Sequence, residues 1–460
     1  MKHLRYVGFI LLVPWMVFAG MPLTFSGYGF DEPWFLWEGW SVRQGLAPYV
    51  DFFDFKPPVL FLTEAAALSL GLDQQRFRLF FLGLVVVSVS ALSAALLRRG
   101  AIAAYAVGFA VASLALLPAL HDSSLNDVET IALSYYLLGL AGFVAGLPGP
   151  GAALLVLSVL TRESFVFLVL PTWGAFFARA DRRDFLRSSV CGALVPFAAV
   201  CAYLACVGGL APWLESYRRS LSFAASYAER IGRWDPGSRW GDQVAGHFWA
   251  GPLSLASLLP FSPFAVFGSV RSKLWGLTAL AGAVYTVTIG HCFWCHYFVV
   301  LVGAFALWAA LAAEDLTPAR LSLVGAASVG LFALVTGLPS PTMPRPCPPP
   351  AASDVLALVR STPKGAWVLS TTPGVYVWGG RRASLAQSAF LDELVDTYPG
   401  ATDRDRFAAI RRELESRPPD VVVLDELALR RGQRHIREVL IPFMGDRYQQ
   451  VGPDLFVRKP

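Results

Sequence analysis

Apolar and polar positions occur in long separate blocks over most of the chain. A helix that crosses a membrane needs about 20 predominantly apolar residues, and many of the blocks reach or approach that length. The pattern predicts about eleven transmembrane helices and an α-helical, polytopic membrane protein. The apolar runs lie at 6–23, 77–97, 101–120, 130–146, in an interrupted pair over 151–178, and at 188–208, 251–269, 274–290, 297–313 and 321–338.

The run at 57–71 is different because it is shorter and weakly flanked. It predicts a helix that lies in the membrane interface instead of crossing. The run at 6–23 has the length of a signal peptide, but no good small-residue cleavage site follows it, so we expect it to remain as the first span. Residues 24–58 then form the first outer loop.

The basic residues between the runs set an orientation. Lys2 and Arg5 precede the first run, and basic turns occur at 98–99, 179–187 and 271–273. Cytoplasmic loops are enriched in Lys and Arg, so these segments and the N-terminus are predicted to be cytoplasmic. An odd number of spans then places the C-terminus outside the cytoplasm.

The pattern changes after residue 338. A proline-rich linker at 339–350 separates the membrane domain, 1–338, from a C-terminal domain at 351–460. Short buried strands are predicted at 366–370 and 421–424, helices at 352–360, 402–416 and 433–441, and a closing hairpin or strand at 447–458. This predicts a small extracytoplasmic α/β domain.

Composition agrees with a membrane protein. The 460 residues are 55% hydrophobic and 15% charged, and their mean hydropathy is +0.51. A soluble domain has about 25% charged residues. The net charge of +5 is modest, and the basic residues are explained by the predicted cytoplasmic side of the membrane. We therefore expect membrane lipids as partners and no nucleic acid.

The first outer loop carries the most unusual chemistry. Charges close to bilayer depth are costly, and membrane proteins that keep them usually use them. Aromatic side chains, which favour the interface, lie between these charges. The charged residues of the loop include Asp31, Glu32, Glu38, Asp51, Asp54 and Lys56.

An Asp-Glu pair after the first run, then GLAPYVDFFDFKPP and an apolar helix, resembles bacterial GT-C glycosyltransferases. The similar members are the protein O-mannosyltransferase and lipid A aminoarabinose transferase group. The segments VYVWGGRRA and PPDVVVLDE also resemble the extracytoplasmic tails of bacterial members. The resemblance implies a GT-C fold in the bacterial inner membrane. It also implies a polyprenyl-phosphate sugar as donor and a lipid, glycan or protein as extracytoplasmic acceptor.

The resemblance implies that Asp31 is the catalytic carboxylate, with Glu32 beside it, and that Lys56 lies near the carrier phosphate. Sugar transfer from a polyprenyl phosphate needs a carboxylate to accept the acceptor's proton and cations to hold the departing phosphate. The alternatives are a capping role for Asp31, a solvated Glu32 and an interfacial anchor at Lys56.

A second polar turn contains Asp127 and Glu129. The resemblance implies that an acidic residue there holds a divalent metal or the acceptor, and carboxylates without paired histidines suit Mg²⁺ or Mn²⁺. Helix capping by Asn126 or Asp127 is the alternative. Arg162 matches a basic residue of the family in layout and is expected at the donor phosphate, unless the neighbouring Glu163 neutralises it.

The sequence HCFWCH, followed by Tyr297, is the last candidate. The resemblance implies a phosphate contact by His291 or His296 together with Tyr297. Interfacial packing is the equally simple alternative, and the C-x-x-C-H pattern is also compatible with haem attachment or zinc. The predicted function is inverting sugar transfer. The alternative functions are a transporter or flippase of lipid-linked sugars and a membrane anchor that displays the tail as a binding module.

Overall fold

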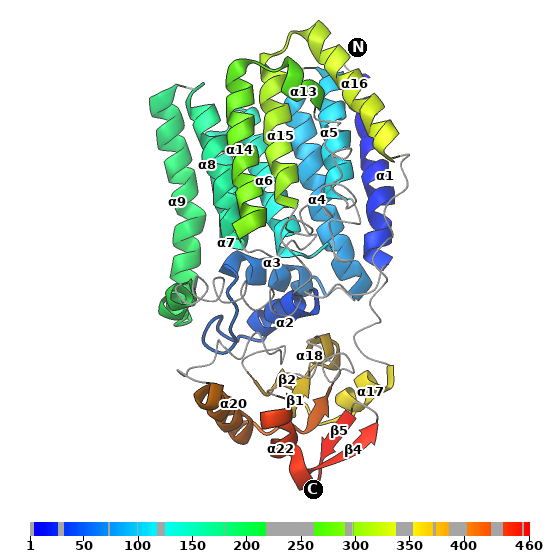
Figure 1. Cartoon of the computed structure of the whole chain (residues 1–460), viewed down its shortest axis with the longest axis vertical. Coiled ribbons are helices and arrows are strands. Elements are labelled where there is room, and N and C mark those ends of the chain that lie inside the picture. The colour runs from blue at the N-terminus through cyan, green and yellow to red at the C-terminus, as the bar shows by residue number, and fades with distance from the viewer. Residues whose placement is uncertain are drawn as a thin grey trace.

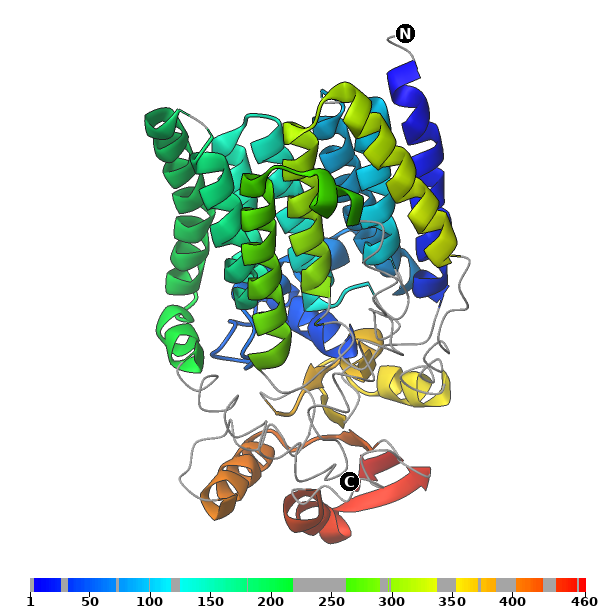
Figure 2. The same cartoon turned by 45° about the horizontal axis from the view of Figure 1, so that its top comes forward.

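The computed structural model describes residues 4–25, 32–71, 74–98, 100–116, 125–179, 181–217, 262–289, 297, 299–336, 353–370, 374–385, 403–424, 436–452 and 455–460. These residues form a helical bundle and a smaller α/β part that lies beyond one end of it (Figure 1). The N-terminus of the chain lies at the opposite end of the bundle (Figures 1 and 2).

The long helices run along the bundle and correspond to the apolar runs of the sequence. They are α1 (Leu4–Phe25), α4 (Gln74–Leu96), α5 (Ala101–Ala115), α6 (Val128–Val144), α7 (Pro148–Thr161), α8 (Val166–Phe177), α9 (Arg182–Cys206), α14 (Val270–Ile289), α15 (Val299–Asp315) and α16 (Pro318–Thr336). The predicted span at 251–269 lies mostly outside the described residues, and its end forms the short helix α13 (Ser262–Phe267).

Two of the described helices are long and apolar enough to cross a membrane. They are Phe77–Leu96 within α4, with a mean hydropathy of 2.4, and Arg182–Cys206, with a mean hydropathy of 2.0. The other apolar helices that were compared are shorter and include α5, α6, α7 and α15.

The turn between α6 and α7 illustrates how local sequence ends these helices. Gly146 has φ +78°, a left-handed conformation that glycine adopts without strain. The N–H of Leu147 donates to the carbonyl of Gly142 at 2.8 Å, and that of Gly146 to Phe143 at 3.0 Å, which is a Schellman motif. Pro148 then occupies the first turn of α7, where its missing N–H costs nothing. The proline-glycine sequence LPGPG at 147–151 suggests a tight turn, but the turn lies at 145–147 and residues 148–151 already belong to α7.

Two shorter helices, α2 (Glu32–Arg43) and α3 (Pro58–Ser69), lie at the end of the bundle that faces the α/β part (Figure 1). The helix predicted at 57–71 is thus confirmed, whereas the first outer loop contains α2, which the sequence pattern had not separated from the loop. The two helices approach closely at Gly39. A Cβ at this position would lie 2.3 Å from the Cβ of Glu64, so no larger residue fits there without movement.

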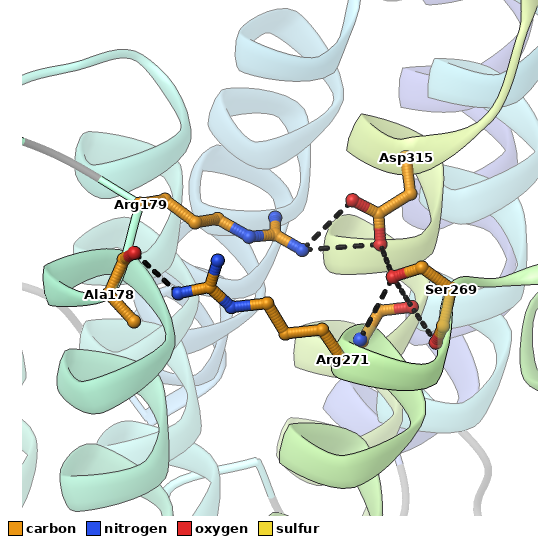
Figure 3. A network of polar contacts seen from close by, with 6 residues as sticks. Ala178, Arg179, Ser269, Arg271 and Asp315 are labelled. Carbon is orange, nitrogen blue, oxygen red and sulfur yellow. Dashed lines mark hydrogen bonds and ion pairs between the residues drawn. The ribbon is translucent and has the colours of Figure 1, made fainter.

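A polar network joins three helices at the opposite end of the bundle. Arg179, after α8, donates to both carboxylate oxygens of Asp315 at 3.1 and 3.2 Å (Figure 3). Ser269 also donates to Asp315, and Arg271 of α14 donates to the carbonyl of Ala178 (Figure 3). This network ties the ends of α8, α14 and α15 together.

The α/β part contains a five-stranded sheet in the order β2-β1-β3-β5-β4. β1 pairs in parallel with β2 and β3, and β5 pairs antiparallel with β3 and β4. The strands are β1 (Trp367–Ser370), β2 (Arg382–Ala383), β3 (Val421–Val423), β4 (Tyr448–Gly452) and β5 (Leu455–Arg458). The predicted strands and closing hairpin are therefore confirmed.

Helices cover both faces of this sheet. Val421 and Val423 belong to the core that continues into the bundle, whereas Val422 belongs to a second core that includes Ile410 and Phe443. This alternation is the period-two pattern of a strand buried on both faces. The helices are α17 (Ser353–Ser361), α18 (Gly374–Gly379), α20 (Asp403–Ser416) and α22 (Ile441–Met444), with a π-helical turn at Ile436–Leu440 before α22.

Candidate functional site

Carboxylates gather where α2, α3 and the adjoining helix ends meet, at the end of the bundle facing the α/β part. Most of them are buried, so each must be neutralised by a proton, a cation or hydrogen bonds. The residues are Glu32, Glu38, Asp54, Glu64, Asp127, Glu129 and Glu163.

Glu32 begins α2 and forms a buried ion pair with Arg78 of α4. Arg78 Nε and Nη2 each lie 2.7 Å from one oxygen of Glu32, which is the bidentate geometry of a strong arginine–carboxylate pair. The side chains are 1% and 4% exposed, respectively, so neither charge is solvated. Arg78 also donates to the carbonyl of Thr24 at 3.3 Å. The pair joins α2 to α1 and α4, at the residue that follows Asp31 in the sequence.

Glu64 of α3 lies in the same region and is fully buried. Asn126 donates to its Oε1 at 3.3 Å and to the Glu32 carbonyl at 3.5 Å. Burial raises the pKa of Glu64 well above its usual value, and the nearby charges of Glu32 and Asp127 raise it further. Glu64 therefore favours its protonated form more than a solvated glutamate does.

The segment between α2 and α3 is organised by its own polar groups. Asp54 accepts hydrogen bonds from the N–H groups of Phe55 and Lys56, the latter at 3.3 Å. Tyr49 has φ +66°, which few non-glycine residues adopt, and its hydroxyl donates to the Lys56 carbonyl at 2.6 Å. Lys56 itself is half-buried. These hydrogen bonds fix the backbone conformation of the segment that contains Lys56.

Glu38 faces this segment from α2. It is fully buried, and neither of its carboxylate oxygens has a well-aligned hydrogen bond within the described residues. Burial raises its pKa well above the usual value, and the nearby carboxylate of Asp54 raises it further, although Trp34 and Lys56 oppose this. Glu38 and Asp54 thus form a pair of carboxyl groups, one of which favours its protonated form.

Arg162 lies in the turn after α7 and contacts residues from three segments. Its Nε lies 3.0 Å from Glu129 of α6, as an ion pair without the alignment of a hydrogen bond, and its Nη1 lies 3.4 Å from Glu163. Its guanidinium carbon lies 5.2 Å from the ring centroid of Tyr297, a cation–π contact. The arginine site, defined here as Arg162, Glu129, Glu163 and Tyr297, therefore carries two carboxylates for one arginine.

Tyr49, in the first loop, is buried, and its pKa is raised by burial first, then by the charges of Asp54 and Glu38, and also by Tyr217 and Glu163. The helix that follows this loop, α3, packs against α7. The first loop and the turn after α7 both lie at the end of the bundle that faces the α/β part (Figure 1).

The structure brings several of the predicted site residues together. Arg162 is in direct contact with Glu129 and Tyr297. Glu163 also forms an ion pair with Arg162, which agrees with the alternative in which Glu163 neutralises the arginine. Asp127 occupies the N-cap position of α6, but its side chain makes no capping hydrogen bond. Asp31, His291 and His296 lie outside the described residues.

The described residues were expected to include ligands for a divalent metal. No group of three or more His, Cys, Asp or Glu side chains suited to a metal occurs within the described residues. Glu129 is engaged by Arg162, and Glu64 favours a proton. The Mg²⁺ or Mn²⁺ site expected close to Asp31 stays a prediction, because Asp31 lies outside the described residues.

Sequence reasoning missed Arg78 and Glu64. Each had a signal, because Arg78 is a charge one residue after the start of the apolar run at 77–97, and Glu64 is the lone acidic residue within 57–71. An isolated charge in an apolar run needs a partner, but the sequence does not say which one.

Comparison with known proteins adds no relative. No protein-family model matches the chain, and no curated protein matches its sequence.

Proposed function

We propose that this protein is an inverting glycosyltransferase of the bacterial inner membrane that transfers a sugar from a polyprenyl phosphate to an extracytoplasmic acceptor. The observation that carries the proposal is the group of buried carboxylates at one end of an apolar bundle, with Lys56 in the first loop and Arg162 after α7 as cations at the same end. The resemblance of GLAPYVDFFDFKPP to GT-C enzymes supports the same reading.

The membrane location is supported by the outer surface of the bundle. Phe18 of α1, Val195 of α9 and Leu274 of α14 are 74%, 68% and 61% exposed. Exposure of many large apolar side chains to water is unfavourable. Only 17% of the apolar stretch of α9 is buried, whereas a core helix of a soluble protein is mostly buried. Lipid is the solvent that fits this surface, and about eleven spans remain our proposal for the topology.

The distribution of charge supports the orientation. Basic residues follow α4 and α8 and begin α9 and α14, at the end of the bundle where the N-terminus lies, whereas the carboxylates of the site lie at the other end (Figure 1). The positive-inside rule assigns the basic end to the cytoplasm. The site and the α/β domain are then extracytoplasmic.

The transfer step needs one group to take the acceptor's proton and others to stabilise the leaving phosphate. Asp31 is our candidate for the base, since it directly precedes the ion-paired Glu32 at the start of α2. The acceptor oxygen attacks the anomeric carbon, the bond to phosphate breaks, and the acceptor's proton passes to the carboxylate. Lys56, in the same loop, is our candidate cation for the phosphate charge that develops. Glu32 acts through its pairing with Arg78 and holds the start of α2.

The proposal is tested by measuring release of polyprenyl phosphate. Purified protein in lipid nanodiscs would receive a panel of defined polyprenyl-phosphate sugars together with envelope extract as the source of acceptor. We expect release from at least one donor, and a loss of about 10²-fold or more in Asp31→Asn. Asp51→Asn is the matched control in the same loop, because Asp51 accepts a 2.7 Å hydrogen bond from the Ala47 N–H that an asparagine oxygen can also accept.

The same assay separates transfer from transport. A flippase would move the intact donor across the bilayer without releasing polyprenyl phosphate, and it needs polar groups midway along its spans. Transport of the intact donor with no release from any member of the panel would overturn the proposal.

A further inference from the structure

The α/β domain contacts the candidate site through a pair of aromatic residues. Trp37 of α2 and Tyr376 of α18 have ring centroids 6.1 Å apart, and Trp37 also contacts Phe52 of the first loop at 5.5 Å. Trp37 is 2% exposed and Tyr376 is fully buried. The contact therefore joins the two parts of the molecule at the helix that carries the site.

Tyr376 is itself held by the sheet. Its hydroxyl accepts a hydrogen bond from the Ser370 N–H at 2.7 Å and donates to the Ser370 carbonyl at 3.0 Å. Ser370 is the last residue of β1, the strand between β2 and β3. The ring that touches Trp37 is thus fastened to the interior of the α/β domain, and the domain cannot move from α2 without breaking this contact.

The contact completes the set of supports around α2. Arg78 holds the first residue of the helix, α3 packs against Gly39, and Tyr376 packs against Trp37 between these two points. Asp31 directly precedes the helix in the chain. A rotation of α2 would displace Glu32 and Glu38, the buried carboxylates that it carries, and small misplacements of groups at a reaction site are costly in rate.

We propose that Trp37 and Tyr376 are positioning residues, through which the C-terminal domain holds α2 in the orientation required for sugar transfer. This inference rests on the proposed function. Under this proposal the α/β domain contributes to sugar transfer by positioning α2, and it is neither a spacer nor a separate binding module.

Single and double substitutions test the catalytic role of the contact. We expect Tyr376→Ala and Trp37→Ala each to lower kcat for polyprenyl-phosphate release by about tenfold and to change KM by less than about twofold, because a positioning contact acts on the transition state more than on binding. The double variant should lose no more than either single variant, since both remove the same contact. Tyr376→Phe retains the ring and should retain most of kcat.

Tyr448→Ala is the matched control in the same domain. The Tyr448 hydroxyl donates to the Pro419 carbonyl at 2.6 Å, and the residue is 7% exposed, so its loss removes a buried tyrosine of the sheet away from α2. We expect it to lower the stability of the domain and to leave kcat unchanged. Equal loss of kcat in Tyr448→Ala and Tyr376→Ala, or additive losses in the double variant, would overturn the proposal.

Hydrogen exchange of the full-length protein provides a second measurement that does not depend on activity. Tyr376→Ala should speed amide exchange in Glu32–Arg43, and Tyr448→Ala should not. Unchanged exchange in α2 would overturn the holding role even if kcat fell. Absence of sugar transfer by the wild-type protein would overturn the proposed function, whereas the exchange experiment would still report whether the domain holds α2.

Discussion

Glu38 presents the clearest electrostatic problem at the scale of single residues. A fully buried carboxyl group beside Asp54 favours its protonated form, and its pKa is raised above the ordinary 4.5. The unfolded chain has no such preference. Unfolding at a pH above about 4.5 therefore releases a proton from Glu38, and stability is lost as the pH rises from there to the raised pKa.

This linkage gives a prediction for Glu38→Gln. The glutamine cannot ionise, so the variant should lose less stability than the wild type as the pH is raised above about 4.5. Thermal unfolding midpoints in detergent, measured across pH, would show the difference. Glu415→Gln is the control, because the Glu415 side chain on α20 is 49% exposed, and it should leave the pH dependence as it is. Equal slopes for Glu38→Gln and the wild type would contradict the assignment.

Lys56 gives a second prediction at this scale. Pro57 and Pro58 follow it and begin α3, and the Tyr49 hydroxyl holds its carbonyl, so the start of its side chain is well defined. Lys56→Met keeps the apolar stem and removes the ammonium group. We expect about 3 kcal/mol less transition-state stabilisation, or about 10²-fold in kcat/KM for polyprenyl-phosphate release.

Lys56→Arg should be rescued only in part, because a planar guanidinium does not replace a compact ammonium. Wild-type turnover by Lys56→Met would assign Lys56 to the membrane interface and leave Arg162 as the described cation for the phosphate.

At the scale of elements, the Glu32–Arg78 pair joins α2 to α4. Removal of one partner from a buried pair leaves an uncompensated charge, which costs about 3–5 kcal/mol. Arg78→Met should therefore lower the unfolding midpoint strongly. The double variant Arg78→Met with Glu32→Gln should recover most of the loss, because neither charge remains. A double variant as unstable as Arg78→Met would show that the pair matters for its geometry and not for its charge.

The crossing of α2 and α3 gives another prediction. In Gly39→Ala the new methyl group would lie 2.3 Å from the Glu64 Cβ and 2.8 Å from the Ala65 backbone nitrogen, so the helices must separate. We expect a cost of about 1–3 kcal/mol, as for other overpacked sites.

Gly83→Ala is the matched control for this substitution. Gly83 lies inside α4, and a Cβ there would meet no atom within 4 Å. Alanine should be neutral or stabilising by up to about 1 kcal/mol, because it lowers the conformational entropy of the unfolded chain relative to glycine. Comparable destabilisation by both substitutions would contradict a close α2–α3 crossing.

At the scale of the whole molecule, the prediction concerns topology. In a cysteine-free background, Cys at Val50, which is 52% exposed in the first loop, should react with an impermeant reagent added outside intact cells. Cys at Lys364 in the α/β domain should react as well. Cys at Leu147, which is 53% exposed in the turn between α6 and α7, should react only after permeabilisation. A protected Lys364 position would overturn the extracytoplasmic assignment of the C-terminal domain.

The sequence by itself determined most of the elements. Apolar runs, their basic flanks, and Gly146 and Pro148 at the turn between α6 and α7 act within a few residues. The helices of the bundle and the strands at 366–370 and 421–424 could therefore be predicted from local sequence. The same local reading found the charged first loop and Arg162. It merged α2 with that loop, because its charges and aromatics hide an apolar period.

Only the tertiary structure decided which charges meet. Glu32 and Arg78 are 46 positions apart, and their pairing depends on the first turn of α2 lying beside the start of α4. Likewise, Arg162 meets Glu129 and Tyr297 because three separate segments end at the same level of the bundle. Trp37 meets Tyr376 across the boundary between the two parts. Such contacts follow from how helices pack, and packing depends on the shapes of whole faces that no local pattern of apolar and polar positions records.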